Sequence, residues 1–315
     1  MRLVLAVAAL ALSLAAQAQQ FPSRTVRFIS GVTPGAASDT MARILAEKLS
    51  PIVGQPVIVE NRLGAGGLVG AKYVAEQAEP DGHTIMMYAS AFTVSTLLSP
   101  GVLDPKELQA VATVATIPTV MITPPGKYKS VQDFVAAAKA EPGKIVCSDA
   151  GIGSATHMAF ERFRFAAGFE ALNVHTKGPS EALTEVISGR ADCYFALVFQ
   201  AQKMREAGKV GALVLSGPKR SSLMPDLPTT EEAGYPNSSY NFWVGALVSA
   251  KTPRPIVERL HKEITTLVES PEVSAQIKKL GADPLPMSIA EFEAMIAKEL
   301  KENAELIKKA GIKAN

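Results

Sequence analysis

The stretch from residue 26 to residue 49, VRFISGVTPGAASDTMARILAEKL, constrains the fold of this chain more than any other. A short apolar run is followed by small residues from Gly31 to Ser38, and then by apolar residues at helical spacing from Met41 to Leu49. The pattern predicts a β-strand, a turn without bulky side chains, and a helix capped by Ser38 or Asp39. Because the first turn of a helix presents unpaired N–H groups and the positive end of its dipole, this turn is a candidate anion site. An ordinary turn that binds nothing is the alternative from this stretch alone.

The strand–turn–helix pattern recurs along the chain, which predicts an α/β class with largely parallel sheets. We expect strands at residues 26–29, 56–60, 84–88, 108–115, 119–123, 145–148, 173–176, 191–197, 210–216 and 242–249. The clearest helices are expected at residues 131–140, 199–207, 253–269, 271–280 and 289–310, the last opened by a capping box at Ser288. The glycines at residues 64–70 predict the start of a helix that turns Val69, Tyr73 and Val74 toward the core. A short helix is also expected at residues 229–234.

The order of the elements predicts two lobes. The strand–helix pattern restarts near Thr119, and a long polar loop at 217–241 is followed by one more strand and three helices. We therefore expect residues 22–118 plus 242–315 in the first lobe and residues 119–241 in the second, with crossovers near 117–122 and 240–246. Ligands in such folds bind beyond the carboxyl ends of the strands, which places the expected ligand cleft between the lobes.

The N-terminus has the features of a secretory signal peptide. Arg2 precedes an apolar run at 3–14, and Ala-Gln-Ala at 16–18 matches a cleavage site. We expect residues 1–18 to be removed after Ala18, which leaves 315 − 18 = 297 residues. The apolar run is too short for a comfortable membrane span, and no later segment is long enough. These features predict an exported, soluble protein.

Charge and cysteine content narrow the classes of partner. The formal net charge is +2, or +1 without Arg2 (2 − 1), and charges of both signs are mixed along the chain. The absence of a basic block argues against nucleic acid as the main partner, whereas a small anion needs only a local site.

Cys147 and Cys193 lie in apolar strand-like segments. Export would allow them to pair, but two buried thiols are the interpretation that the sequence favours.

Motifs of common enzyme classes are missing. There is no Walker A, HExxH or GxSxG pattern, and the glycines at 64, 66, 67 and 70 miss the dinucleotide spacing because residue 69 is valine. The four histidines, at 83, 157, 175 and 261, show no i, i+4 pair, so we expect neither a metal nor a cofactor. His157 and His175 remain candidates for hydrogen bonding to a ligand. Ser154 with His157 is the only local pair that an exported hydrolase could use.

Four glycine- or serine-rich helix starts offer a different chemistry, at residues 33–39, 90–94, 151–157 and 177–180. Two belong to each expected lobe. Backbone N–H groups and hydroxyls in such loops suit a small carboxylate, whereas bond-making needs a poised base or nucleophile. The sequence therefore favours ligand binding over catalysis.

Over essentially its whole mature length, the chain resembles the periplasmic solute-binding proteins of tripartite tricarboxylate transporters, the Bug-type receptors. The resemblance rests on TPGAASDTMAR at 33–43, GQPVIVENRLGAGGLVGA at 54–71, PDGHT at 80–84, SDAGIGSATH at 148–157, HTKGPSEALTEVISGRAD at 175–192 and MPDLPTTEEAGYP at 224–236. It implies the two-lobe periplasmic-binding-protein fold (type II-like) with two hinge crossovers, and a small carboxylate held between the lobes. It also implies hinge closure and delivery to integral-membrane transporter subunits.

Several positions depart from the usual pattern of this family. Ala36 and Ala37 replace glycines of the first loop, and Thr176 replaces a tyrosine. Ala196 follows Phe195 where the family typically has an aspartate. An acid at 196 would suit a ligand that carries an amino group, so its loss predicts a di- or monocarboxylate rather than an amino acid.

Aromatic residues near these segments raise a second hypothesis about the ligand. Phe92, Phe195 and Phe199 lie in or beside the segments that carry the resemblance. They favour a ligand with an apolar and even aromatic body. The alternative is that these rings belong to the hydrophobic core.

The expected ligand contacts come from all four loops and from the strand at 191–197. The residues are Thr33, Gly35, Ala36, Ala37, Ser38, Asp39, Ser90, Ala91, Phe92, Thr93, Gly151, Gly153, Ser154, His157, Thr176, Gly178, Phe195 and Ala196. Donors are expected to be backbone N–H groups and the hydroxyls among these residues. The predicted function is that of a monomeric periplasmic binding protein without catalytic residues; a ligand-sensing co-receptor for a signalling system is the main alternative.

Overall fold

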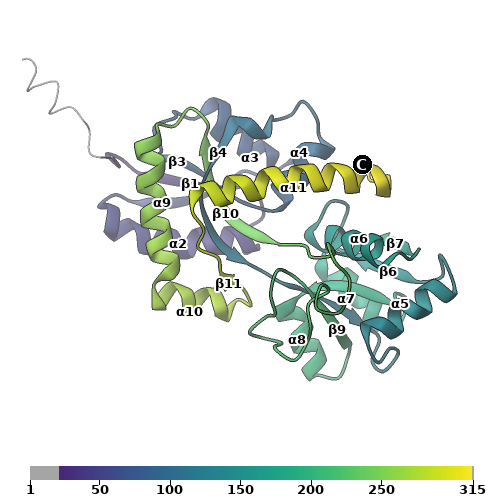
Figure 1. Cartoon of the computed structure of the whole chain (residues 1–315). Helices are drawn as coiled ribbons and strands as arrows, with labels where there is room; N and C mark the ends of the chain where they lie inside the picture. Colours follow the sequence, from purple (N-terminus) through teal and green to yellow (C-terminus); the bar gives the residue numbers. More distant parts are fainter. Residues whose placement is uncertain (1–20, 314–315) are drawn as a thin grey trace, which may run out of the picture.

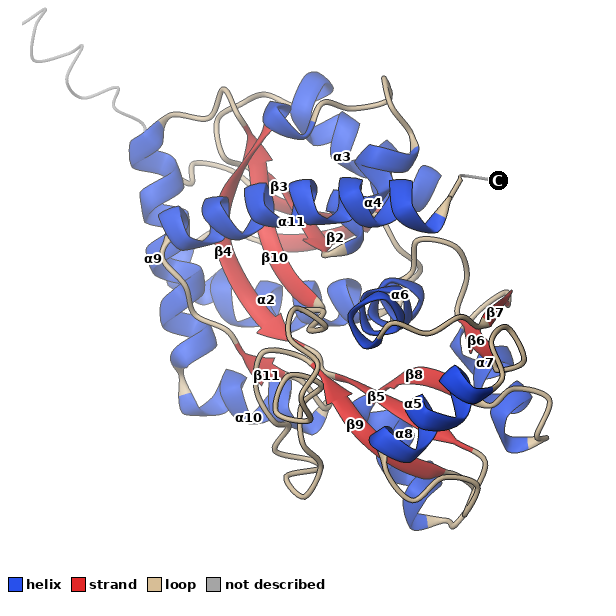
Figure 2. Cartoon of the chain, turned by 45° about the vertical axis from the view of Figure 1, so that its right-hand side comes forward, coloured by secondary structure: helices blue, strands red, loops and turns tan. Residues whose placement is uncertain are grey.

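The computed structural model describes residues 21–313, which form two β-sheets with helices packed on their faces (Figures 1 and 2). The first sheet has six strands in the order β11-β4-β10-β3-β1-β2, and the second has five in the order β7-β6-β8-β5-β9. Each sheet with its helices forms one lobe, so the predicted two-lobe α/β fold is confirmed. The expected signal peptide at 1–18 lies outside the described residues.

The elements of the first lobe come from both ends of the described chain. Its strands are β1 (Val26–Ser30), β2 (Val57–Asn61), β3 (Thr84–Ala89), β4 (Leu108–Thr116), β10 (Trp243–Ser249) and β11 (Asp283–Pro284). Its helices are α2 (Ala37–Val53), α3 (Leu68–Lys72), α4 (Ala91–Leu98), α9 (Arg254–Glu269), α10 (Pro271–Lys279) and α11 (Ile289–Ala310), with short turns of helix η1 (Ala65–Gly67), η2 (Tyr73–Gln77) and η3 (Pro105–Glu107).

The second lobe is built from the middle of the chain. Its strands are β5 (Thr119–Thr123), β6 (Val146–Asp149), β7 (Leu172–His175), β8 (Cys193–Leu197) and β9 (Gly211–Ser216). Its helices are α5 (Val131–Ala140), α6 (Ala155–Ala167), α7 (Pro179–Ile187) and α8 (Val198–Glu206). The strand bounds agree with the sequence pattern to within a few residues, because short apolar runs between turn residues are a strong local signal.

Both sheets are mixed, and the expectation of largely parallel sheets is wrong. Strand β1 pairs in parallel with β2 and β3, and β6 pairs in parallel with β7 and β8. However, β10 runs antiparallel to β3 and β4, and β5 runs antiparallel to β8 and β9. Strand β11 is also antiparallel to β4. Strands β5 and β10 are the first strands after each crossover, so the chain enters each second segment of a lobe from the opposite direction.

The two crossovers lie side by side and are hydrogen bonded to each other. The N–H of Ile117 donates to Phe242 O at 2.8 Å. Beside this contact, Thr116 Oγ1 donates to Asn241 Oδ1 at 2.6 Å. The N–H of Ser90 donates to Trp243 O at 3.0 Å, which ties the start of α4 to the second crossover.

Helix α11 reaches both lobes. Figure 2 shows it lying across the first lobe with its C-terminal end near α6. Ile289 and Phe292, near its start, pack in the core of the first lobe, whereas Leu306 packs in a core of the second. The capping box predicted at Ser288 is confirmed. No helix among residues 21–313 is long and apolar enough to cross a membrane.

Three local predictions are wrong. Helix α2 has Ala36 as its N-cap, not Ser38 or Asp39, because the helix begins earlier and Asp39 falls in its first turn. Val69 is 48% exposed rather than facing the core, since the helix turns Leu68 inward instead, although Val74 is buried as expected. Residues 229–234 form turns rather than a helix.

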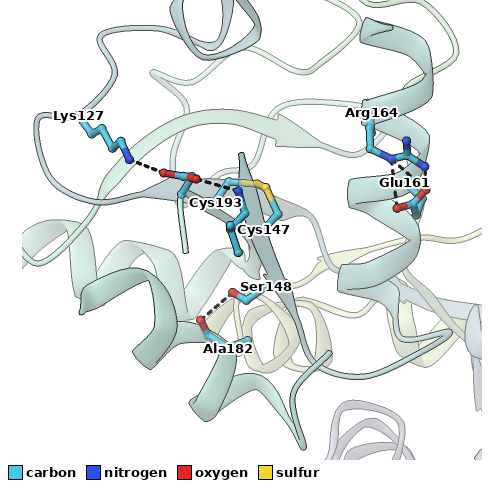
Figure 3. The surroundings of a disulfide bond; sticks show 9 residues. Lys127, Cys147, Ser148, Glu161, Arg164, Ala182 and Cys193 are labelled. Atoms are coloured by element: carbon cyan, nitrogen blue, oxygen red, sulfur yellow. Dashed lines mark hydrogen bonds and ion pairs between the residues drawn. A yellow bond between two sulfur atoms is a disulfide. The ribbon is translucent and has the colours of Figure 1, made fainter. Parts of the chain in front are cut away.

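Cys147 and Cys193 form a disulfide between β6 and β8 (Figure 3). Both residues are completely buried, as expected, but the favoured interpretation of two free thiols is wrong. The two are direct partners in the parallel register of the sheet, and their Cα atoms are 4.6 Å apart. The pairing register of β6 and β8 places the two cysteines opposite each other. This register joins residues 46 positions apart, so the local sequence around each cysteine does not reveal it.

Candidate functional site

The loops of the first lobe that follow β1, β2 and β3 are packed tightly together. Gly31 lies so close to Gly67 that an added Cβ would be 2.6 Å from Gly67 Cα. An added Cβ on Gly66 would lie 2.5 Å from Ser95 Oγ, on helix α4. The glycine-rich segment at 64–67 therefore packs between the first and the second predicted loop. Its glycines are needed because larger side chains would clash there, so no bound dinucleotide is required to explain them.

The same chain of contacts continues into the second lobe. An added Cβ on Gly153 would lie 3.1 Å from Leu98 Cδ1 and 3.2 Å from Val94 Cγ1 of helix α4. An added Cβ on Gly151 would lie 3.4 Å from Thr176 O. Through these contacts the four predicted loops, two from each lobe, form one continuous cluster.

Three of the four helices that begin in this cluster lack a side-chain cap. Helices α2, α4 and α7 have the N-cap residues Ala36, Ser90 and Gly178 without a capping bond, whereas α6 is capped by Ser154. Elsewhere, α5, α10 and α11 are capped by serines, and α8 and α9 are not capped. The uncapped starts leave backbone N–H groups for a ligand, and the helix dipoles favour a negative one.

The first loop is held by Asp39, which is completely buried. Its carboxylate accepts hydrogen bonds from the N–H of Gly35 at 2.8 Å, from Arg43 Nε at 2.9 Å and from Asn61 Nδ2 at 2.7 Å. Burial raises the pKa of Asp39, but these hydrogen bonds outweigh it and hold the pKa below its usual value. Asp39 therefore fixes the backbone of the loop, and its charge is engaged by Arg43 rather than presented to a ligand.

A matching carboxylate, Asp149, holds the third loop. Asp149 Oδ1 accepts a hydrogen bond from the N–H of Gly151 at 2.7 Å, and Oδ2 lies 2.7 Å from His175 Nδ1. The hydroxyl of Thr176 donates to the Asp149 carbonyl oxygen at 2.7 Å, which joins the third and fourth loops. Asp149 is completely buried, so each lobe has one buried carboxylate bonded to a predicted ligand loop.

His157 is turned toward this pair. The N–H of Gly153 donates to His157 Nδ1 at 3.0 Å, and the ring centroids of His157 and His175 are 4.8 Å apart. One potential metal-ligand atom from each of Asp149, His157 and His175 lies within 4.8 Å of the other two. His157 Nδ1 accepts the bond from Gly153, so the ring proton of the neutral imidazole is on Nε2. In a metal site one ring nitrogen binds the metal and the other donates a hydrogen bond, which this arrangement does not allow. The cluster fits a brace for the loop better than a metal site.

A cavity of about 410 Å³ lies beside this brace. It is lined by His157 and His175, by Asn173, and by residues 310–313 at the end of α11. Burial lowers the pKa of His157, so its imidazole is neutral near pH 7. The Ser154–His157 pair does not have the geometry of a nucleophile and its base, because Ser154 Oγ accepts from the His157 backbone N–H as a helix cap.

Most of the hydroxyls expected as ligand donors are engaged within the protein. Ser90 Oγ accepts from Tyr240 at 3.0 Å, and Thr93 Oγ1 donates to Ser90 O at 2.9 Å. Thr176 Oγ1 donates to backbone carbonyls, and Ser154 caps α6. Short hydroxyl side chains in loops bond readily to nearby backbone groups. Backbone N–H groups therefore remain as the main donors of the cluster.

The three phenylalanines have different surroundings. Phe92 is buried in the core of the first lobe beside Tyr88, and Phe195 is buried in the second lobe beside Phe163. The core alternative is therefore correct for these two rings. Phe199, at the start of α8, is half-buried and packs against Gly281. Ala196 is buried on the other face of the second sheet.

The predicted site residues differ in exposure, which follows from their place in each loop. Thr33 and Gly35 are exposed. Those that are half-buried are Ala36, Ala37, Ala91, Gly151, Gly153, Ser154, Thr176 and Gly178. Those that are buried are Ser38, Asp39, Ser90, Phe92, Thr93, His157, Phe195 and Ala196. The sequence reasoning missed the bracing roles of Arg43, Asn61, Asp149 and Tyr240; only the i, i+4 spacing of Asp39 and Arg43 could have signalled one of them.

Comparison with known proteins gives a consistent family. A family model described as "Tripartite tricarboxylate transporter family receptor" matches residues 41–312. A UPF0065 protein from the tcbD–tcbE intergenic region of Pseudomonas sp. (strain P51) is 34% identical over 288 residues, which cover 89% of this chain and 85% of the relative. BugT of Bordetella pertussis is 29% identical over 301 residues, which cover 94% of this chain and 92% of BugT.

Solved structures show the same fold. A protein of R. palustris solved with adipate is 26% identical with a TM-score of 0.78, and the match covers 93% of this chain and 99% of that one. MatC from Rhodopseudomonas palustris, with bound malate, is 26% identical with a TM-score of 0.74, covering 91% of this chain and all (100%) of MatC. The periplasmic binding protein BugD is 29% identical with a TM-score of 0.74, covering 94% of this chain and 100% of BugD.

Proposed function

Because this chain belongs to the tripartite tricarboxylate transporter receptor family, whose members are periplasmic solute-binding proteins and not enzymes, we propose that it captures a small carboxylate between its two lobes and delivers it to a membrane transporter. The observation that supports this proposal most directly is the cluster of uncapped helix starts at α2, α4 and α7. Backbone N–H groups and helix dipoles at these starts favour a carboxylate, and they come from both lobes.

The proposed mechanism is capture by closure. We take residues 22–118 plus 242–315 and residues 119–241 as the two lobes, joined at the paired crossovers. A ligand that contacts loops of both lobes favours the closed arrangement only through contacts that the open arrangement lacks. Gly153 against helix α4 marks the place where the loops of the two lobes meet. Waters are able to bridge the ligand to backbone groups that it does not reach directly.

The ligand is proposed to be a mono- or dicarboxylate without an amino group. This expectation rests on the resemblance, in which an aspartate that would suit an ammonium group is typical at position 196, where this chain has an alanine. The structures solved with adipate and with malate concern aliphatic dicarboxylates, which makes this class the first to test. An aromatic ligand has less support, because Phe92 and Phe195 are core residues.

The partners and location follow from the same proposal. We propose a periplasmic protein, monomeric in solution, with residues 1–18 acting as the export signal. Its partners would be the carboxylate and the integral-membrane subunits of the transporter. A sensor that hands the same binding event to a signalling partner would use the same site.

A thermal-shift screen of the mature protein tests the proposed ligand class. The panel contains citrate, C4–C6 dicarboxylates, benzoate, aromatic dicarboxylates, aspartate and glutamate. Binding to the native state raises the unfolding midpoint by mass action, so we expect one class of carboxylate without an amino group to raise it strongly. Stronger shifts with aspartate or glutamate would contradict the prediction, based on Ala196, that the ligand carries no amino group. No shift with any carboxylate, on folded protein free of carried-over ligand, would overturn the proposed function.

A further inference from the structure

We infer that Glu299 and Asn303, on helix α11, are positioning residues of the ligand site that set the loop at 90–93 through the hydroxyl of Thr93. The inference rests on the proposed function, because it assumes that this loop contacts the ligand. Neither residue lies in a loop of the site: both are more than two hundred positions away in sequence from Thr93.

The contacts around Thr93 are completely buried. Asn303 Nδ2 donates to Thr93 Oγ1 at 2.9 Å, and Thr93 Oγ1 donates to Ser90 O at 2.9 Å. Glu299 Oε2 lies 3.4 Å from the same hydroxyl and accepts a hydrogen bond from Trp243 Nε1 at 2.9 Å. Helix α11 therefore holds the start of α4 and the second crossover together.

The contacts extend into the second lobe through Arg162 of helix α6. Its Nη2 donates to Asn303 Oδ1 at 2.9 Å, and its Nη1 donates to Glu302 Oε2 at 2.9 Å. Asn303 thus bonds to a loop of the first lobe with its amide nitrogen and to the second lobe with its amide oxygen. Because α11 packs on both lobes, a change in the angle between the lobes strains the chain of contacts from Arg162 through Asn303 to the hydroxyl of Thr93.

The charge of Glu299 decides where the single proton of Thr93 points. Burial raises the pKa of Glu299 to about 7, although Trp243, Arg162 and Thr93 favour the ionised form. Two other charged or titratable groups face it: the charge of Glu302 on α11 raises the pKa of Glu299, and the charge of Glu299 raises the pKa of Tyr240. The ionised carboxylate attracts the Thr93 proton away from Ser90 O. In the protonated acid this oxygen is an uncharged and weaker acceptor, so Thr93 Oγ1 donates to Ser90 O, the nearer of its two acceptors.

Two consequences for a bound anion have the same sign. Above about pH 7 the loop loses part of its support, and a buried negative charge lies behind it. Below that pH both effects disappear. The ligand carboxylate should therefore bind less tightly as the pH rises through about 7. This pH dependence should be absent from the Glu299→Gln variant.

The experiment compares Glu299→Gln and Asn303→Ala with the wild type and with Glu305→Gln, which removes an exposed carboxyl from the same helix. Isothermal titration with the tightest carboxylate of the thermal-shift panel is performed from pH 5.5 to pH 8.5. We expect wild type and Glu305→Gln to lose affinity several-fold across pH 7, and Glu299→Gln to lose the pH dependence. Asn303→Ala should bind about tenfold more weakly at every pH, the equivalent of one lost buried hydrogen bond.

A purely structural role would give a different result. If both variants only lower the unfolding temperature and keep the affinity and pH profile of the wild type, the inference is overturned. Amide hydrogen exchange of residues 90–94 in the ligand-free protein tests the same link when no carboxylate binds. Faster exchange in Asn303→Ala, with a pH dependence near 7 that Glu299→Gln abolishes, would support the link, whereas unchanged exchange would overturn it.

Discussion

The hydroxyl of Tyr240, at the start of the second crossover, donates a hydrogen bond to Ser90 Oγ at 3.0 Å. Tyr240 packs in the core of the second lobe, whereas Ser90 begins helix α4 of the first lobe. This bond therefore ties a loop of the candidate site to the opposite lobe, next to the paired crossovers. It also engages Ser90 Oγ as an acceptor and so fixes the position of one of the hydroxyls that the sequence assigns to the ligand.

Replacing Tyr240 by phenylalanine tests the strength of this tie. The ring stays in place and one buried hydrogen bond is lost, so the free energy of unfolding should fall by about 1 kcal/mol. Urea denaturation of Tyr240→Phe beside Tyr235→Phe measures the difference, because Tyr235 packs on Phe163 in the same lobe. Equal midpoints for the two variants would mean that the bond to Ser90 adds nothing.

Stability should depend on the ionisation of Glu299. Its pKa is about 7 in the folded protein against 4.5 in the reference state, so the folded state binds the proton more tightly. The stability that this proton contributes is complete below pH 4.5 and is lost as the pH rises through 7. The raised pKa corresponds to at most about 3 kcal/mol. Urea denaturation at pH 5 and pH 8 should show a smaller loss in Glu299→Gln than in the wild type; parallel losses would contradict the buried acid.

Removing the disulfide should destabilise the second lobe. The bond between Cys147 and Cys193 closes a loop across 46 positions and lies within a paired strand register. The double variant Cys147→Ala/Cys193→Ala should lose about 2–4 kcal/mol of unfolding free energy. Denaturation of the oxidised wild type with and without dithiothreitol provides the matched comparison. Free thiols titrated in the unfolded, unreduced protein would show that the bond does not form.

Asp39 should be required for the shape of the first loop. Asp39→Ala leaves the N–H of Gly35 and the side chains of Arg43 and Asn61 without their shared acceptor. We expect stability to fall by about 1–3 kcal/mol and carboxylate affinity to fall at least about tenfold. Calorimetric titration compares the carboxylate affinity of Asp39→Ala with that of Asp104→Ala, which removes a helix cap elsewhere in the same lobe. The difference is the effect on affinity that is specific to the first loop. Unchanged affinity in Asp39→Ala would mean that the loop keeps its shape without this carboxylate.

The lobes and the candidate loops could be predicted because their signals are local. Alternating apolar runs and small-residue turns specify strand and helix starts within a window of a dozen residues. The capping box at Ser288 is a pattern of four residues, and it is present as predicted. The same local reasoning failed at Asp39, because its partners include Asn61, which is 22 residues away.

By itself the sequence determined the α/β class, the two-lobe order and the position of the loops, since each depends on residues that are neighbours in the chain. Only the tertiary structure decided which strands run antiparallel, that Cys147 pairs with Cys193, and that the hydroxyls of Ser90 and Thr93 are held by Tyr240 and Asn303. These contacts join residues up to 210 positions apart. A buried polar group must find a hydrogen-bond partner wherever packing places one, and local sequence patterns do not specify that place.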